Sequence, residues 1–212
     1  MSTELGRLHV VSDARDGRDA LGVVAAAVAA GAPVVQVRAK DCTDLELYDF
    51  ARRVMELCAP ARATCIVNDR VDVALAVGAA GTHLGAEDLP VAAVRRVAGP
   101  GHLIGGTARG PEQAAALVAA GADYLGVGPA YRTVTKAGLP GPLGPDAIGA
   151  VASAVDVPVI AIGGVRAEHV PDLVAAGVHG VAVVTAISDA PDPVEATRTL
   201  LRLLGAHDES RR

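Results

Sequence analysis

The stretch VAAGADYLGVG, residues 118–128, is one of four similar segments that together decide the fold. In each segment an Ala-rich run ends at a Gly and leads into a short apolar run. Gly adopts the left-handed conformation of a helix C-cap at little cost, so the Ala-rich run is expected to end a helix. The apolar run is typical of a parallel strand covered on both faces. The other segments are VAAGAPVVQVR (28–38), LAVGAAGTHLG (75–85) and VAAGVHGVAVV (174–184).

Similar units lie between these segments, so the whole chain is expected to alternate strands with helices. Thr43 is a favourable N-cap residue for one helix, and Pro111 a favourable first residue for another. The expected strands are RLHVVSD (7–13), VVQVR (34–38), TCIVN (64–68), GTHLG (81–85), HLIGGT (102–107), DYLGVG (123–128), VPVIAIGG (157–164) and GVAVVTA (180–186). The expected helices span residues 17–30, 43–58, 70–78, 90–98, 111–120, 145–154, 167–176 and 192–204.

Eight strand–helix units in 212 residues predict an α/β fold, a single-domain (β/α)₈ TIM barrel over residues 1–205. The polar tail, residues 206–212, is expected to be disordered. An open, doubly wound sheet is the competing fold. It fits less well, because no G-x-G-x-x-G motif opens an early helix in this sequence.

The composition limits the classes of partner. The chain is 51% hydrophobic with one Phe, three Tyr and no Trp, and its net charge is −5. It therefore lacks both the aromatic platforms and the basic surface of nucleic-acid binders. No apolar run reaches the roughly 20 residues of a membrane helix, and no signal pattern opens the sequence. We expect a cytoplasmic protein that binds small molecules, with apolar outer helices that leave room for a homodimer.

Polar residues interrupt the apolar pattern where the expected strands end, which is where TIM barrels carry their active sites. The cations Arg38, Lys40 and Lys136 are suited to phosphate oxygens. The Gly163–Gly164 pair lets backbone N–H groups approach a phosphate closely. Hydroxyl groups come from Thr107, Thr133, Thr135 and Thr185.

The stretch IVNDR (66–70) places an amide, a carboxylate and a guanidinium at one strand end. Asp69 and Asp88 follow adjacent strands and could together hold Mg²⁺, which favours few protein carboxylates and keeps several waters. A simpler interpretation makes Asp69 a helix N-cap and Arg70 a surface charge. Gln36 is likewise either a ligand-binding residue or an amide inside the barrel.

These motifs resemble the thiamine phosphate synthase family over nearly the whole chain. The matching pieces are VQVRAKD (35–41), IVNDRVDVALAVGAAGTHLGAEDLP (66–90), IGGT (104–107), GADYLGVGPAYRTVTK (121–136), AIGGV (161–165) and GVAVVTAI (180–187). The resemblance implies a TIM-barrel transferase that joins hydroxymethylpyrimidine diphosphate to a thiazole phosphate. The products are thiamine phosphate and pyrophosphate.

The resemblance also implies a role for each matching residue. Asp69 and Asp88 would bind one Mg²⁺ ion, and Arg38, Lys40, Lys136 and Thr107 would act in catalysis. The pyrimidine diphosphate would contact Gln36, Val37, Arg38, Ala39, Lys40, Asn68, Thr107 and Lys136. The thiazole phosphate would contact Thr133, Val134, Thr135, Gly164, Val184 and Thr185. The implied mechanism is dissociative, with pyrophosphate leaving before the thiazole nitrogen attacks.

Departures from the family leave alternatives open. The family often has Ser at Thr107 and Thr185, Gln at Ala86 and His at Arg109. A related thiazole tautomerase shares the fold, needs no Mg²⁺ and carries a His in the loop after the sixth strand. That loop, GPAYRTVTK (128–136), has none here. A non-catalytic thiazole phosphate binder is the other alternative, and the Gly- and Pro-rich segment 136–145 suits a mobile lid.

Overall fold

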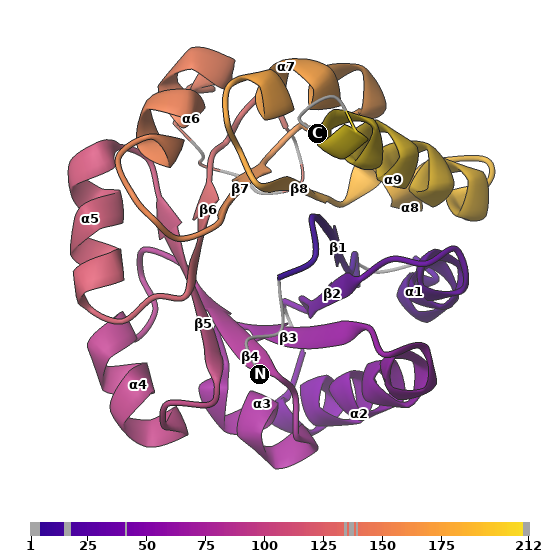
Figure 1. Cartoon of the computed structure of the whole chain (residues 1–212). Coiled ribbons are helices and arrows are strands. Elements are labelled where there is room, and N and C mark those ends of the chain that lie inside the picture. Colours follow the sequence, from indigo (N-terminus) through magenta and orange to yellow (C-terminus); the bar gives the residue numbers. More distant parts are fainter. Residues whose placement is uncertain are drawn as a thin grey trace.

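The strands form a closed parallel barrel in chain order, with β1 hydrogen-bonded to β8 (Figure 1). The computed structural model describes residues 5–14, 18–40, 42–133, 135, 138 and 140–209, with side chains up to residue 205. The strands are β1 (Leu8–Val11), β2 (Val34–Val37), β3 (Thr64–Asn68), β4 (Gly81–Leu84), β5 (Leu103–Ala108), β6 (Tyr124–Val127), β7 (Val159–Ile162) and β8 (Gly180–Val183). The predicted (β/α)₈ architecture is therefore confirmed.

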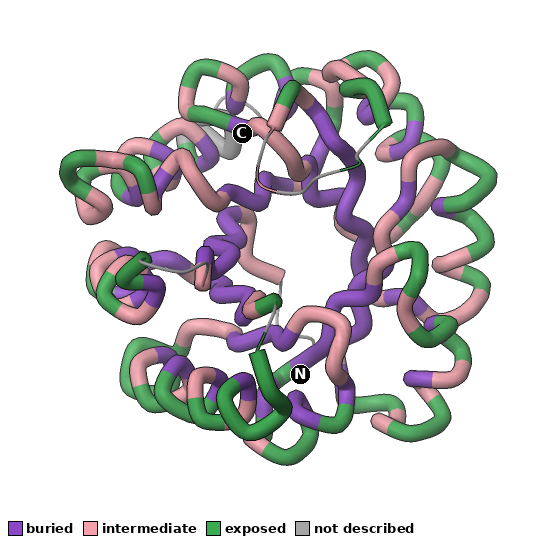
Figure 2. The backbone as a smooth tube through the Cα atoms, turned by 180° about the vertical axis from the view of Figure 1, so that it is seen from behind, coloured by how far each residue is buried: buried purple, intermediate pink, exposed green. Residues whose placement is uncertain are grey.

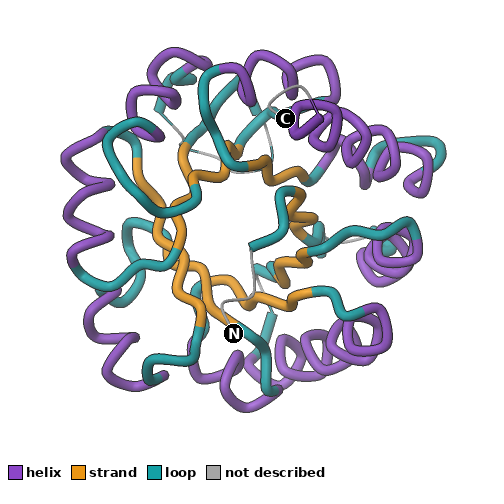
Figure 3. The backbone as a smooth tube through the Cα atoms, viewed as in Figure 1, coloured by secondary structure: helices purple, strands orange, loops and turns teal. Residues whose placement is uncertain are grey.

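Helices surround the barrel as an outer ring (Figure 3). They are α1 (Ala20–Ala29), α2 (Asp44–Ala61), α3 (Val71–Val77), α4 (Val91–Ala98), α5 (Pro111–Ala119), α6 (Gly144–Ala152), α7 (Val170–Ala175), α8 (Thr185–Ser188) and α9 (Pro193–Glu209), with a 3₁₀ turn, η1 (Ala167–His169), before α7. Within the described residues, no helix combines the length and apolar character needed to cross a membrane.

Local sequence signals explain where several helices begin and end. Thr43 forms a capping box with Glu46: its hydroxyl accepts the Glu46 N–H at 3.3 Å, and the Glu46 carboxylate accepts the Thr43 N–H at 2.8 Å. Pro111 opens α5 as predicted. The glycines after the four repeated helix ends have positive φ, 98° at Gly31 and 100° at Gly121 for example, as a C-cap requires.

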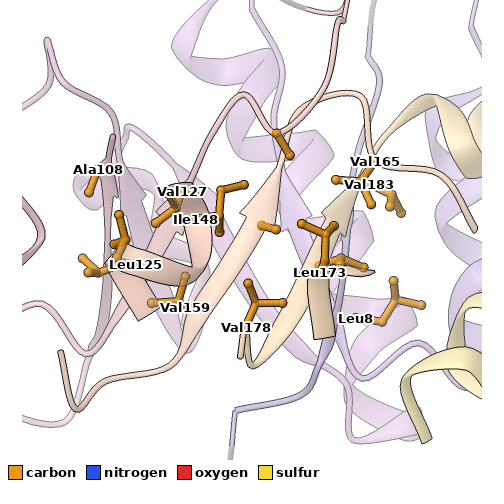
Figure 4. Close-up of a cluster of buried hydrophobic side chains, with 14 of the residues drawn as sticks. Leu8, Ala108, Leu125, Val127, Ile148, Val159, Val165, Leu173, Val178 and Val183 are labelled. Carbon is orange, nitrogen blue, oxygen red and sulfur yellow. The ribbon is translucent and has the colours of Figure 1, made fainter. Parts of the chain in front are cut away.

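The apolar core has three clusters, two of them between strands and helices, and the second of these includes Val35 of β2 and Val54 of α2. In the first of these, Leu125 and Val159 of the barrel lie in one cluster with Ile148 and Leu173 of the helices (Figure 4). The third cluster fills the barrel and is formed by Val11, Val34, Ile66, Tyr124, Ile160 and Ala182. Figure 2 shows the result: the barrel is buried, and exposed backbone belongs mainly to the outer ring.

The C-terminal region differs from the predicted pattern. A four-residue helix, α8, stands between β8 and the last helix. The sequence pattern missed it because four residues are too few for a helical period to appear. The last helix continues to Glu209, so the backbone of residues 206–209, predicted as part of a disordered tail, is helical. Residues 210–212 lie outside the described part of the chain.

Candidate active site

The predicted site residues lie at the carboxyl ends of the strands, which all meet at one end of a parallel barrel. Gln36 and Val37 lie in β2 with Arg38, Ala39 and Lys40 after it; Asn68 ends β3 and precedes Asp69; Asp88 follows β4; Thr107 lies in β5; Thr133 and Thr135 follow β6; Gly164 follows β7; Val184 and Thr185 follow β8. Val134 and Lys136 lie outside the described residues. The fold thus brings together the other predicted residues, which come from seven strands of the barrel.

Asp69 and Asp88 form a carboxyl pair. The backbone of Asp69 is left-handed, with φ of 64°, and its N–H donates to the His83 carbonyl at 2.8 Å. Asp tolerates this conformation better than most residues. Burial, followed by hydrogen bonding and repulsion from Asp88, raises the pKa of Asp69 to about 6, and Lys40 opposes this shift. Asp88 is held by the Gly85 N–H, which donates to its Oδ2 at 2.6 Å.

Two cations flank Asp69 and have different partners. Lys40 Nζ lies 3.4 Å from Asp69 Oδ2. Arg70 instead binds Asp44 at 2.5 Å and Asp72 at 2.7 Å, on the outer surface. Arg70 is also the N-cap residue of α3, and no side chain caps that helix. The simpler interpretation is therefore right for Arg70 and wrong for Asp69, whose carboxyl interacts with Asp88 and Lys40 instead of capping a helix.

The backbone of Arg38 is fixed by a residue that the sequence did not single out. Ser12, buried just after β1, accepts the Arg38 N–H at 2.8 Å and donates to the Arg38 carbonyl at 2.9 Å. Because Ser12 binds both the N–H and the carbonyl group of Arg38, it holds the start of the β2–α2 loop against β1. A short polar residue at a strand end was the only available signal for this role.

A polar chain occupies the inside of the barrel. His83 of β4 contacts the Tyr124 hydroxyl through Nδ1 and the Thr107 hydroxyl through Nε2, each at 3.0 Å. His83 is thus a buried histidine with a hydrogen-bond partner at each ring nitrogen. Gln36 is also buried, on the same face of β2 as Val34 of the barrel interior. The amide thus lies inside the barrel, near the end where the predicted site residues gather.

The loop after β6 packs against the turn after β7. The Ala130 N–H donates to the Ile162 carbonyl at 2.8 Å. Gly163 and Gly164 have positive φ of 93° and 68°, and a Cβ on Gly164 would lie 2.4 Å from the Arg132 carbonyl oxygen. No side chain therefore fits at Gly164. Thr133 and Thr135 follow, with their hydroxyl oxygens 3.3 Å apart.

Arg109, a departure from the family pattern, bridges two loops. Its guanidinium donates to the Gly128 carbonyl at 2.9 Å and to the Gly141 carbonyl at 3.0 Å. Arg109 thus ties the end of β6 to the segment before α6, within the range predicted to form a lid. Of that range, the structure describes Gly138 and residues 140–145, so the lid stays a prediction.

Replacing Arg109 with Ala is expected to accelerate amide hydrogen exchange at Leu143 and Gly144, whose N–H groups donate to the Pro129 and Ala130 carbonyls. Losing two partly exposed hydrogen bonds corresponds to an increase of about fivefold. Exchange measured by NMR on the intact protein checks this.

The matched control for this experiment is Arg96→Ala, at an exposed position of α4. This variant also removes an arginine side chain, but at a position outside the segment before α6. Equal exchange rates in both variants and the wild type would show that Arg109 does not hold the segment.

Comparisons with known proteins show which family this chain resembles in sequence and fold. The profile of the thiamine monophosphate synthase family matches residues 8–187. The thiamine-phosphate synthase of Salinispora tropica is 58% identical over 205 residues, covering 95% of this chain and 99% of that protein. The thiamine-phosphate synthase of Salinispora arenicola is 56% identical over the same coverage. Among solved structures, thiamine phosphate pyrophosphorylase from Pyrococcus furiosus superposes with a TM-score of 0.86 at 32% identity, covering 94% of this chain and 96% of that one.

Proposed function

Because the chain belongs to the thiamine monophosphate synthase family, we propose that the carboxyl end of its barrel joins hydroxymethylpyrimidine diphosphate to a thiazole phosphate. Family membership makes the protein a thiamine phosphate synthase, a transferase of thiamine biosynthesis. One observation carries the proposed chemistry. The Asp69–Asp88 pair, Lys40 and Thr107 all lie at the carboxyl end of the barrel. We expect the enzyme to act in the cytoplasm, and a homodimer remains a prediction.

The pyrimidine diphosphate is assigned to the β2, β3 and β5 side of the site. Arg38 and Lys40 supply charge for the diphosphate oxygens, and the buried Gln36 amide faces the ring inside the barrel mouth. Asn68 and Thr107 add an amide and a hydroxyl. The stretch 36–40 is supported by Ser12, which holds the Arg38 backbone through two hydrogen bonds. Lys136 keeps the role that its motif implies.

The Asp69–Asp88 pair fits a magnesium ion. Two carboxyl groups close enough to raise one pKa repel each other when both are ionised, and a divalent cation relieves that repulsion. Both residues are partly exposed, which leaves room for water and phosphate oxygens. Among the described residues, no group of three or more His, Cys, Asp or Glu side chains is placed to hold a metal, so two carboxylates would carry the site. Bound Mg²⁺ would neutralise charge on the departing pyrophosphate.

The thiazole phosphate is assigned to the β6, β7 and β8 side. Thr133, Thr135 and Thr185 offer hydroxyl groups for the phosphate oxygens. Gly164 has no side chain, so a phosphate can approach its backbone N–H closely. Val184 and Thr185 start the short helix α8. A short extra helix after the eighth strand is a common phosphate-binding device in TIM barrels.

The protein needs no nucleophile of its own for this reaction. Once pyrophosphate departs, the aminopyrimidine ring stabilises positive charge on its methylene carbon, and the thiazole nitrogen forms the new bond there. Arg38, Lys40 and Lys136 hold the leaving group, while the two sides of the barrel fix the distance between the reacting atoms. The polar groups described at this end serve binding and orientation, which suits a dissociative substitution.

A turnover assay tests this proposal. Purified protein, both substrates and Mg²⁺ are expected to give thiamine phosphate and pyrophosphate in equal amounts, and EDTA should stop the reaction. Parallel assays with carboxylated and uncarboxylated thiazole phosphate identify the preferred substrate.

Two results of that assay would contradict the proposal. Isomerised thiazole phosphate without pyrophosphate release would identify a tautomerase. Saturable binding of thiazole phosphate by folded protein without any product would identify a binder.

A further inference from the structure

The end of β1 lies between the two sides of the proposed site. β1 pairs with β2, the first strand of the pyrimidine diphosphate side, and with β8, the last strand of the thiazole phosphate side. None of the residues assigned to either substrate follows β1. Two polar residues, Ser12 and Asp13, nevertheless follow this strand directly, and both are buried. Burying polar groups is costly unless they have partners, so the partners of these two residues indicate what they do.

Asp13 contacts an arginine that also binds the end of α8. Nη1 of Arg18 lies 3.1 Å from Asp13 Oδ2. The same nitrogen donates to the Ser188 hydroxyl at 3.2 Å and to the Asp189 carboxylate. The Ser188 hydroxyl in turn donates to Asp13 Oδ2 at 3.5 Å. Because the Asp13 side chain is 1% exposed, Arg18 joins a buried carboxylate at the end of β1 to the carboxyl end of α8.

Arg18 is fixed at its backbone as well as at its guanidinium. It directly precedes Asp19, the N-cap residue of the ten-residue helix α1, whose carboxylate accepts the Gly22 N–H at 2.9 Å. Side-chain capping of this kind fixes the start of a helix. Arg18 therefore binds α8 from a capped helix on one side and from the Asp13 carboxylate on the other.

The short helix α8 depends on contacts from its surroundings. Its four residues are too few to hold a helix by backbone hydrogen bonds alone. Ile187 is fully buried and attaches α8 to the apolar core. Apolar attraction is non-directional, so it does not by itself set the orientation of the helix. The hydrogen bonds from Arg18 to Ser188 and Asp189 supply that direction.

Ser12 plays the corresponding part on the other side of the site. Besides its two hydrogen bonds with Arg38, its N–H donates to the Gln36 carbonyl at 2.9 Å. Consecutive residues at the end of one strand thus hold opposite sides of the barrel mouth. Ser12 holds residues 36–38, and Asp13 holds α8 through Arg18.

We propose that Asp13 and Arg18 are positioning residues that hold α8, and with it Val184 and Thr185, in place for thiazole phosphate. This inference rests on the proposed function for the identity of the ligand, but the hold on α8 is a property of the protein alone. Neither residue needs to touch a substrate for this role. Without their contacts, α8 would have to be ordered as the phosphate binds, and that cost weakens binding.

Amide hydrogen exchange of the intact, substrate-free protein tests the hold on α8. The N–H groups of Ser188 and Asp189 donate to the Val184 and Thr185 carbonyls at 3.0 and 3.1 Å. In Arg18→Gln we expect both groups to exchange about tenfold faster, because losing charged hydrogen bonds favours opening of the helix. Asp189→Asn changes only a half-exposed side chain and should give a smaller increase at Ser188. Wild-type rates in both variants would overturn the inference, whatever the protein does with substrates.

Arg52→Gln on α2 is the matched control for the exchange experiment. It also removes an exposed arginine with an ion pair of its own, at 2.5 Å to Glu56. We expect wild-type exchange at Ser188 and Asp189 in this variant. An equal acceleration in Arg52→Gln and Arg18→Gln would show that the effect does not come from the contacts of Arg18 with α8.

Steady-state kinetics test which substrate each residue serves. Arg18→Gln is expected to raise KM for thiazole phosphate about tenfold and to leave KM for the pyrimidine diphosphate unchanged. Ser12→Ala is expected to show the reverse pattern, with a rise of about fivefold for the pyrimidine diphosphate alone. Asp13→Asn should behave as Arg18→Gln does, and combining these two changes should add little to either.

The crossed pattern separates positioning from a general loss of structure. If the end of β1 served stability alone, Arg18→Gln and Ser12→Ala would raise both KM values together, and that result would contradict the proposal. Full additivity of Asp13→Asn and Arg18→Gln would contradict it too. A wild-type protein without turnover would overturn the proposed function and the choice of ligand, whereas the exchange rates would still decide whether Arg18 holds α8.

Discussion

Replacing Asp69 with Asn is expected to lower turnover by about 10³-fold or more, because several kcal/mol of charge stabilisation is lost with the metal. The change is nearly isosteric. Asn also tolerates the left-handed backbone of this position, where φ is 64°. The substitution therefore removes charge with little change in shape, and the loss should persist at saturating Mg²⁺.

The same variant is expected to be more stable than the wild type when no metal is present. The pKa of Asp69 rises from 3.8 to about 6 on folding, chiefly through burial and then through Asp88. A raised carboxyl pKa costs the folded state stability above about pH 6, and the cost disappears as pH falls toward about 4. Because the side chain is 25% exposed, we expect a gain of about 1–2 kcal/mol for Asp69→Asn near about pH 8, and none near about pH 4.

Both effects can be measured on one protein preparation. Steady-state turnover gives the first, and urea unfolding in EDTA at the two pH values gives the second. Glu87→Gln is the matched control, because it removes the same charge from an exposed residue next to Asp88, in the loop between β4 and α4. Turnover near the wild-type value in Asp69→Asn, or a loss of stability at the higher pH, would contradict the assignment of the carboxyl pair.

Replacing Gly105 with Ala is expected to destabilise the barrel by about 3 kcal/mol or more, because overpacking a core forces side chains or backbone to move. The new methyl group would overlap the Tyr124 ring and His83, with contacts of 2.2 and 2.4 Å. Both neighbours are buried inside a closed barrel, so neither has free space to enter. The melting temperature should fall by about 10 °C.

Gly106 provides the control on the same strand. Its Cβ would face the other way and meet the flexible end of Leu117 at 3.2 Å, so a much smaller effect is expected for Gly106→Ala. Combining Gly105→Ala with Tyr124→Val should recover part of the lost stability, since the smaller side chain makes room for the methyl group. Equal melting temperatures for the two single Ala variants would show that the barrel interior is not packed as described.

The fold could be predicted because its signals are local. The repeated Ala-rich helix ends, their glycines and the apolar strands that follow each lie within about ten residues, and strand order in a barrel follows chain order. The candidate site could be outlined for the same reason, because a residue that follows a strand must lie at the carboxyl end. The short helix α8 was missed, since its four residues carry no period.

The supporting contacts could not be predicted because they join distant parts of the chain. Arg109 reaches Gly141 across 32 positions, and His83 reaches Tyr124 across 41. Ser12 holds Arg38 because of the register in which β1 pairs with β2, which the sequence of neither strand reveals. The sequence indicated which residues could meet a substrate, but not which residues hold them in place.

The central claim is that Asp69 and Asp88 hold the ion that receives pyrophosphate. Calorimetric titration of pyrophosphate into the protein, with and without Mg²⁺, tests it most directly and requires no turnover. We predict tight binding that depends on Mg²⁺ in the wild type and in Glu87→Gln, and loss of that dependence in Asp69→Asn and Asp88→Asn. Unchanged Mg²⁺-dependent binding in both Asn variants would contradict the claim.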